Sequence, residues 1–181
     1  LTVFQRRPNW CAPLHNSYIK TDEMKVIKAG YKEMFERCSK TQAGFLHTVD
    51  SRGTFEVTEK ERYDFWEHLY ASKGFGIWQG NFKDMLTNPS ANKAMSNFIA
   101  NKIRERVSDP KVAEKLIPKD HGFGTRRVPL ETGYYESYNQ ENVELVDINE
   151  TPIDRITPTG ILTTEKEFDL DFIIYATGFD A

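Results

Sequence analysis

The sequence predicts a mixed α/β fold in which two sheet-forming ends enclose a helical middle. Residues 1–5 are a short β-prone run, and residues 172–175 are a continuous apolar run followed by small residues, as in a buried strand of a parallel sheet. Over residues 20–117, apolar side chains instead recur at helical spacing. With 181 residues, the chain is long enough to bury one sizeable core or two small ones.

One apolar face defines the first predicted helix. Its members follow the i, i+4, i+7, i+8, i+11 spacing of a single helix face and are Ile27, Tyr31, Met34, Phe35 and Cys38. We therefore expect these side chains to pack in the core.

Three further helices are indicated by their start signals. A capping box spans Thr58 to Glu61, Ser90 is a candidate cap, and Asp109-Pro110 places a cap before a proline at the first helical position. We expect Gly74 and Gly76 to end the first of these helices. Their apolar residues at core spacing are Phe65, Trp66, Leu69, Tyr70, Met95, Phe98, Ile99 and Ile103.

After Pro118 the pattern changes to loops and short elements. A glycine loop around residues 122–124 precedes two adjacent arginines. A short helix is expected over residues 134–138, a strand over 142–146, and a hairpin over 153–164.

The chain is expected to be an internal part of a longer protein, because a domain seldom begins in the middle of a strand. A β-prone run starts at Leu1, and the other end lies three residues after Gly178, just past an apolar run. We divide the chain into residues 1–19 and 118–181, which would belong to one domain, and the helical segment 20–117 between them.

Composition argues against several partners and sites. A net charge of -3 and a pI near 5.9 give no general attraction to nucleic acid or to an anionic membrane. No apolar run reaches the roughly 18 residues needed to span a bilayer. Two cysteines without CxxC spacing and four scattered histidines predict neither a disulfide framework nor a metal site. The simplest expected compartment is a reducing cytoplasm.

Arg6 and Arg7 follow the first predicted strand. Two guanidinium groups at a strand end can bind a dianionic phosphate, because arginine presents a planar fork of donors. In dinucleotide-binding folds, an arginine near this position accommodates the 2′-phosphate that distinguishes NADP from NAD. The alternative, which spacing alone favours, is an ordinary solvated strand end.

Arg126 and Arg127 follow the glycine loop. Glycine lets a backbone turn tightly or approach a ligand closely, and a permanently charged arginine can stabilise a developing oxyanion. The alternative is a surface basic pair matched to Asp120 or Glu131. Of the histidines, only His121 lies near this candidate site in the sequence.

Several long motifs follow one another along essentially the whole chain. They are Val3-Phe-Gln-Arg-Arg-Pro8 with Trp10 and Pro13, Phe98-Ile-Ala-Asn-Lys-Ile103, Asp109-Pro-Lys-Val-Ala-Glu-Lys-Leu-Ile-Pro118, Phe123-Gly-Thr-Arg-Arg127, Gly133-Tyr-Tyr-Glu136, Asn142-Val-Glu-Leu-Val-Asp147, Pro152-Ile-Asp-Arg-Ile-Thr157 and Ala176-Thr-Gly-Phe-Asp-Ala181. In this order they resemble the type I Baeyer–Villiger monooxygenase family, in particular its phenylacetone, cyclohexanone and steroid monooxygenase-like members. The resemblance implies an incomplete NADP-binding, Rossmann-like domain of the FAD/NAD(P)-binding fold with a large helical insertion.

The resemblance also implies a flavin enzyme with FAD and NADP as cofactors, which converts ketones to esters or lactones with NADPH and O2 through a peroxyflavin. Arg6 and Arg7 match positions that bind the 2′-phosphate of NADP, although many relatives have a small hydroxyl residue at the second position. Arg126 matches a basic residue, usually lysine, that also contacts NADP. Arg127 matches the active-site arginine, which also holds the nicotinamide, and Val128 matches a position that tunes substrate fit.

Neither GxGxxG motif of the family occurs in this chain. The resemblance therefore implies that the FAD domain of the same enzyme is required and that this chain alone is inactive. Two alternatives stay open. One is N- or S-oxidation, as in the flavin-containing monooxygenases, which lack the helical insertion and the Gly-Thr-Arg-Arg context. The other is a non-catalytic module that binds a partner through its helices.

Overall fold

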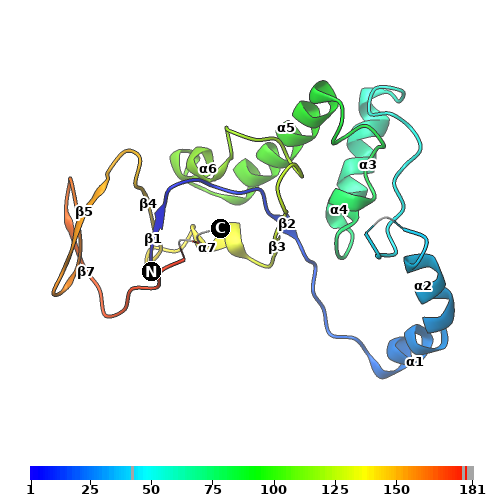
Figure 1. Cartoon of the computed structure of the whole chain (residues 1–181), viewed down its shortest axis with the longest axis horizontal. Helices are drawn as coiled ribbons and strands as arrows, with labels where there is room; N and C mark the ends of the chain where they lie inside the picture. Colours follow the sequence, from blue (N-terminus) through cyan, green and yellow to red (C-terminus); the bar gives the residue numbers. More distant parts are fainter. Residues whose placement is uncertain (42, 177, 179–181) are drawn as a thin grey trace.

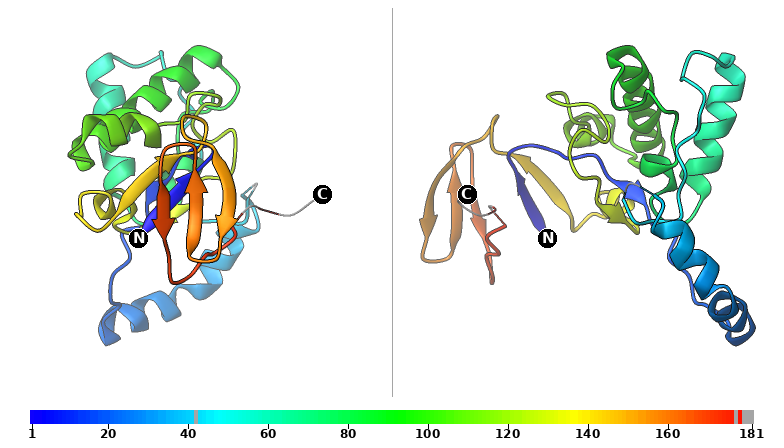
Figure 2. Two further views of the ribbon diagram at one scale, coloured as in Figure 1. Left: turned by 90° about the vertical axis from the view of Figure 1, so that its left-hand side faces the viewer. Right: turned by 45° about the vertical axis from the view of Figure 1, so that its right-hand side comes forward.

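The computed structural model describes residues 1–41, 43–176 and 178. Its mixed α/β architecture is the one that the sequence predicts, and its elements are spread along one long axis (Figure 1). A small antiparallel sheet lies at one end and most of the helices lie at the other, with two parallel strand pairs between them (Figure 2).

Both parallel pairs join the start of the chain to residues far along it. Strand β1 (Thr2–Gln5) pairs with β4 (Glu144–Asp147), and strand β2 (Ala12–Pro13) pairs with β3 (Leu130–Glu131). The predicted strands at residues 1–5 and 142–146 are thus confirmed to within two residues. These pairings bring the segment after β1 next to the segment before β3.

The antiparallel sheet confirms the predicted hairpin. Strands β5 (Ile153–Thr157) and β6 (Gly160–Thr163) pair as expected, and a third strand, β7 (Glu167–Asp169), pairs with β6. Strand β7 was not predicted from the sequence, although Phe168, Leu170 and Phe172 alternate with acidic residues, a pattern typical of a strand. The Phe168 ring packs edge-on against Phe4 of β1, with ring centroids 5.0 Å apart.

Three of the four helices predicted before Pro118 form close to their expected positions. They are α3 (Glu59–Ala71), α5 (Pro89–Arg106) and α6 (Pro110–Leu116). The capping box of Thr58 and Glu61 is present at the start of α3. At the start of α6, the Asp109 carboxylate accepts the Lys111 backbone N–H at 2.7 Å, which confirms the predicted cap.

The start of α5 differs from the prediction by two residues. The cap is Asn88 rather than Ser90, because the Asn88 side-chain oxygen accepts the backbone N–H groups of Ser90 and Ala91. Two single-turn helices complete this part of the fold, α4 (Gly76–Gln79) and the predicted short helix α7 (Tyr134–Ser137).

The first predicted helix differs from the prediction in two respects. It is divided at Gly30 into α1 (Thr21–Ala29) and α2 (Tyr31–Cys38), and neither part contains a buried residue. Phe35 of the expected core face is 67% exposed. Glycine has a low helix propensity, which explains the division. An apolar stripe is buried only where another surface covers it, and within the described residues nothing covers this one.

The prediction of a buried strand at residues 172–175 is wrong for this chain. Phe172, Ile174 and Tyr175 are exposed, and the segment is not assigned to a strand. A buried parallel strand needs neighbouring strands to pair its backbone groups. No described strand pairs with this segment. Within the motif that follows, residues 177 and 179–181 lie outside the described residues.

The hydrophobic core joins the long helices to the segment around β2 and β3. Its members include the predicted residues Trp66, Leu69, Met95, Phe98, Ile99 and Ile103. Phe65 and Tyr70 pack against this core without being fully buried. From the later part of the chain, Phe123, Val128 and Tyr135 are at most 1% exposed. The core therefore extends into the loop that carries the two adjacent arginines.

Arg106 at the end of α5 closes this core with a compact ion-pair network. Its guanidinium contacts Glu131 of β3 at 2.7 Å, Glu136 of α7 at 2.6 Å and the Tyr70 hydroxyl of α3 at 3.0 Å. The side chains of Arg106 and Glu131 are 18% and 6% exposed. Hydrogen bonds from Arg106 hold the pKa of the Glu136 carboxyl below its usual value. We call these four residues the Arg106 cluster.

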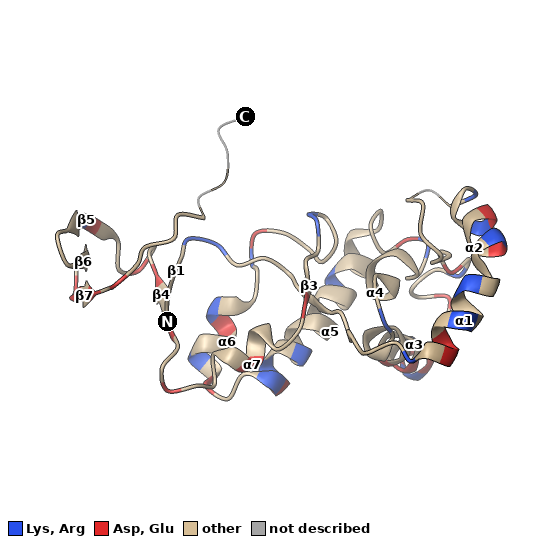
Figure 3. Ribbon diagram, turned by 90° about the horizontal axis from the view of Figure 1, so that it is seen from below, with Lys and Arg blue, Asp and Glu red and all other residues tan. Residues whose placement is uncertain are grey.

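Basic and acidic residues both occur along the helices, notably α1, α2 and α6 (Figure 3). This distribution agrees with the small net charge of -3. Among the described residues, no helix combines the length and the apolar character needed to cross a membrane.

Candidate functional site

The candidate site forms where the segment after β1 meets the loop before β3. Hydrogen bonds connect the two segments along their length. The Trp10 indole N–H donates to the His121 carbonyl at 3.0 Å, the Asn9 side-chain amide donates to the Arg127 carbonyl at 3.1 Å, and the backbone N–H of Ala12 donates to the Pro129 carbonyl at 3.0 Å. Both predicted arginine pairs therefore lie beside the line of contact between these two loops, which we call the seam.

The helices hold the arginine loop in place. The Phe123 side chain is fully buried, and its backbone N–H and carbonyl bond to Ser96 and Asn92 of α5 at 2.9 and 2.8 Å. The close contact with α5 explains Gly122, because a Cβ there would lie 1.6 Å from the Asn92 side-chain oxygen. Gly124 has a φ of +79°, a conformation that favours glycine. The glycines therefore allow a tight turn and a close contact with α5, while their close approach to a ligand stays a prediction.

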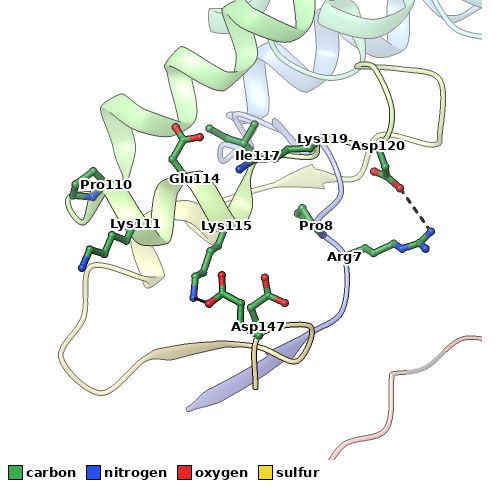
Figure 4. Close-up of a pocket in the computed structure, with 11 residues that line it drawn as sticks. Arg7, Pro8, Pro110, Lys111, Glu114, Lys115, Ile117, Lys119, Asp120 and Asp147 are labelled. Atoms are coloured by element: carbon green, nitrogen blue, oxygen red, sulfur yellow. Dashed lines mark hydrogen bonds and ion pairs between the residues drawn. The ribbon is translucent and has the colours of Figure 1, made fainter. Parts of the chain in front are cut away.

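Asp120 gathers three basic side chains at this seam. One carboxylate oxygen contacts Arg126 at 3.2 Å and Arg7 at 3.7 Å, and the other contacts the His121 ring at 2.7 Å. Figure 4 shows Arg7 and Asp120 facing each other from the two segments. The hydrogen bond from His121, together with the nearby charge of Arg126, holds the pKa of the Asp120 carboxyl below its usual value. We call Asp120, His121, Arg7 and Arg126 the Asp120 cluster.

The alternative interpretation of Arg126 as a surface ion-paired residue is correct in one respect. Arg126 does pair with Asp120, whereas Glu131 is already taken by Arg106. The side chains of Arg7 and Arg126 are 66% and 50% exposed. Exposed ion pairs are weak, so both guanidinium groups remain able to turn toward an incoming anion.

The other predicted site residues lie close to this cluster in different environments. Arg6 and Arg127 are exposed, and their carbonyls accept hydrogen bonds from Asn149 and Asn9. Within the described part of the chain, neither guanidinium has a carboxylate within 4.0 Å. Val128 is 1% exposed and belongs to the hydrophobic core. Contact of Val128 with a substrate therefore stays a prediction.

An open cleft of about 870 Å³ lies beside Arg7 (Figure 4). Its lining mixes both signs of charge and comprises Arg7, Pro8, Pro110, Lys111, Glu114, Lys115, Ile117, Lys119, Asp120, Asp147 and Glu150. Lys115 is neutralised by Glu150, whereas Arg7 and Arg126 share one carboxylate. The lining has four basic and four acidic side chains, and an excess of positive charge arises only beside Arg7, where Arg126 contacts Asp120 from outside the cleft.

Sequence inspection missed Asn9 and singled out His121 only by its position. Asn9 links the two segments through contacts to residues 112 and 118 positions away. No local pattern carries that information, because an isolated asparagine in a loop has many ordinary structural roles. Among the described residues, no group of three or more His, Cys, Asp or Glu side chains is arranged to hold a metal ion.

Comparison with known proteins identifies close relatives over the whole chain. The chain is 52% identical to a 2-oxo-Δ3-4,5,5-trimethylcyclopentenylacetyl-CoA monooxygenase from Pseudomonas putida and 43% identical to a cyclopentanone 1,2-monooxygenase from Comamonas sp., in both cases over 100% of this chain. The crystal structure of OTEMO in complex with FAD and NADP superimposes with a TM-score of 0.96 at 52% identity over 99% of this chain. No protein-family model matches the chain.

The coverage of these relatives is partial, since the chain spans about a third of their length, or 33% in each of these three cases. A further relative bears on the type of reaction. A phenazine N-monooxygenase from Lysobacter antibioticus is 36% identical over 99% of this chain. The same segment thus occurs in proteins named for oxidation at carbon and at nitrogen.

Proposed function

We propose that this chain is the NADP-binding part of a flavin-dependent enzyme that converts ketones to esters or lactones with NADPH and O2. The basis is its homology to type I Baeyer–Villiger monooxygenases, of which it covers about one third of the length. The observation that carries the proposal is the sharing of Asp120 by Arg7 and Arg126. Two segments 113 or more residues apart thereby present their guanidinium groups at one place.

Within this proposal, residues 1–19 and 118–181 belong to an NADP-binding domain of the Rossmann type, and residues 20–117 are a helical insertion in it. The parallel pairing of β1 with β4 supports the first part, because parallel strands are characteristic of that fold. The positions of the helices support a helical insertion, since α1 to α6 all lie within residues 20–117.

The basic residues of the site fit the phosphate of NADP. Arg7 and Arg126 would exchange their contact with Asp120 for bidentate contacts with the 2′-phosphate, and Arg6 would add charge from the same strand end. The fit rests on the exposure of these guanidinium groups and on their shared carboxylate. No GxGxxG loop for the pyrophosphate occurs in the chain. That part of the binding would come from the remainder of the enzyme.

Arg127 is the residue that we assign to the reaction. FAD and NADPH supply the electrons, and O2 supplies the oxygen atom that is inserted. Arg127 stays protonated at any working pH, so its charge can stabilise an oxyanion that develops on the ketone oxygen. Its backbone is held by Asn9 at one side, and buried Val128 follows it in the chain. A fixed backbone limits the positions that the guanidinium can reach, which preorganises the charge.

This chain offers no described glycine-rich loop for the phosphates of FAD. The proposal therefore requires the FAD domain of the same enzyme, and it predicts that the 181 residues alone do not oxidise ketones.

The decisive experiment is an Arg127→Ala substitution in the full-length, flavin-loaded enzyme. Ester or lactone formation from a panel of cyclic and linear ketones should fall by about 10²–10³-fold, the usual loss when one stabiliser of developing charge is removed. Bound flavin and thermal stability should not change. The control is Arg155→Ala, because Arg155 is an exposed arginine of β5 whose ion pair, among the described residues, is with its neighbour Asp154. Undiminished ketone oxygenation by Arg127→Ala would refute the assignment.

N-oxidation is a second candidate reaction, and the phenazine N-monooxygenase among the relatives supports it. Parallel assays with ketones and with nitrogen heterocycles separate the two reactions, since only one class should give an oxygenated product at a useful rate. A non-catalytic module is the remaining alternative. It predicts a full-length protein without flavin absorbance and without NADPH oxidation.

A further inference from the structure

His121 occupies a fixed position between the two segments of the candidate site. Its side chain is 6% exposed, although it lies on a loop. One ring nitrogen, Nδ1, lies 2.7 Å from a carboxylate oxygen of Asp120. The other, Nε2, lies 3.1 Å from the side-chain oxygen of Asn9. The imidazole therefore bridges the loop that carries Arg126 and Arg127 to the segment that carries Arg7.

Asn9 presents an acceptor to this ring. Its side-chain oxygen also accepts the backbone N–H of Trp10 at 3.0 Å, and its amide nitrogen donates to the Arg127 carbonyl at 3.1 Å. A backbone N–H can only donate and a carbonyl can only accept, so these two partners fix the orientation of the amide. Exchange of the oxygen and nitrogen would break both contacts.

Both ring nitrogens of His121 consequently face acceptors. The contact with Nδ1 occupies one carboxylate oxygen of Asp120, so that Arg7 and Arg126 share only the other oxygen. The contact of Nε2 with Asn9 fixes the ring relative to the segment that carries Arg7. His121 and Asp120 also line a second, separate cleft. The other charged residues in its lining are Lys93, Arg104, Glu114 and Lys119, of which Arg104 and Glu114 pair with each other at 2.6 Å.

We propose that His121 is a positioning residue that sets the preference of this site for a nucleotide with a 2′-phosphate. It holds Asp120 and Asn9 so that the two loops present the Arg7 and Arg126 guanidinium groups side by side. The proposal rests on the proposed function, because it concerns the same NADP site. NADPH and NADH differ only in the 2′-phosphate, so a residue that acts through the arginine pair should affect NADPH far more than NADH.

The test uses the full-length, flavin-loaded enzyme and three variants of one position. His121→Phe keeps a ring of similar shape and removes both donors. His121→Asn places an amide N–H near the former Nδ1, toward Asp120, and His121→Gln places one near the former Nε2, toward Asn9. KM and kcat are measured with NADPH and with NADH for each variant, together with thermal stability.

We expect His121→Phe to raise KM for NADPH about tenfold, the cost of one lost charge-assisted hydrogen bond, and to leave KM for NADH and both kcat values nearly unchanged. His121→Asn should restore most of the discrimination, and His121→Gln should restore less of it. If His121→Phe does not fold, the proposal is tested by whether His121→Asn discriminates between NADPH and NADH more strongly than His121→Gln does. Equal losses with both nucleotides, or equal discrimination by Asn, Gln and the wild type, would show a purely structural residue and overturn the proposal.

Arg126→Ala, measured in parallel, separates this proposal from the proposed function. If Arg126→Ala lowers the discrimination against NADH and His121→Phe does not, only the role of His121 is refuted. If Arg126→Ala has no effect on the discrimination, the 2′-phosphate site itself is refuted, and the role of His121 is refuted with it.

Discussion

The two arginine-centred clusters of this molecule differ in how their charges are matched. In the Arg106 cluster, one guanidinium serves two carboxylates, Glu131 and Glu136, and the arginine side chain is only 18% exposed. In the Asp120 cluster, one carboxylate serves Arg7, Arg126 and His121, and the arginines are half or more exposed. The first cluster is complete without a ligand. The second has positive charge in excess.

The difference separates a structural use of arginine from a binding use. A buried ion pair is costly to break, because removing one partner leaves the other charge without compensation. An exposed pair contributes little stability, so its members can change partners at small cost. Arginine therefore has a structural role in the Arg106 cluster, where it connects α5 to three other elements. In the Asp120 cluster, our proposal gives arginine the role of binding a phosphate.

Loss of the buried arginine should give the largest effect. Arg106→Met keeps the length of the side chain but leaves the buried Glu131 carboxylate without its partner. We expect the full-length protein to lose about 3 kcal/mol of stability, seen as a clear fall in Tm. Arg104→Met is the matched control, since Arg104 lies on the same helix and its pair with Glu114 is exposed on both sides. Equal falls in Tm for the two variants would contradict the structural role of the Arg106 cluster.

Removal of the exposed arginines should instead affect binding. A double Arg7→Ala and Arg126→Ala substitution should raise KM for NADPH by about 10- to 100-fold, because each arginine would lose a charge-assisted contact with the phosphate. Tm should remain close to that of the wild type, since both pairs are exposed. The comparison between the clusters fails if the double variant is destabilised as strongly as Arg106→Met.

Salt should give the smallest effect and should again distinguish the clusters. The Debye length falls from about 10 Å at 0.1 M to about 3 Å at 1 M ionic strength, so exposed charges are screened and partly buried ones much less. Raising the salt over this range should increase KM for NADPH several-fold and change KM for NADH little. If KM rises equally for NADPH and NADH, the exposed arginines do not select the phosphate.

Much of the secondary structure could be predicted from local signals. The capping box at Thr58, the Asp109-Pro110 start and the core residues of α3 and α5 formed as expected, because each depends on residues within a few positions of one another. The cap of α5 was misplaced by two residues and the division at Gly30 was missed, whereas the failed predictions of burial needed a distant partner. The apolar faces at residues 21–38 and 172–175 have the right composition for burial, but composition does not supply the surface that covers them.

The candidate site divides in the same way. The sequence by itself determined that two arginine pairs exist, that glycines 122 and 124 shape the second loop, and that the motifs resemble one family. Only the tertiary structure decided that Arg7 and Arg126 share Asp120, that Glu131 belongs to Arg106 instead, and that Asn9 and His121 join the two loops. Apart from the Arg126–Asp120 pair, which spans six residues, these contacts span 25 to 118 residues of chain. The contacts between the two loops accompany the parallel pairing of β2 with β3, which local patterns do not encode because a strand's own residues do not specify its distant partner.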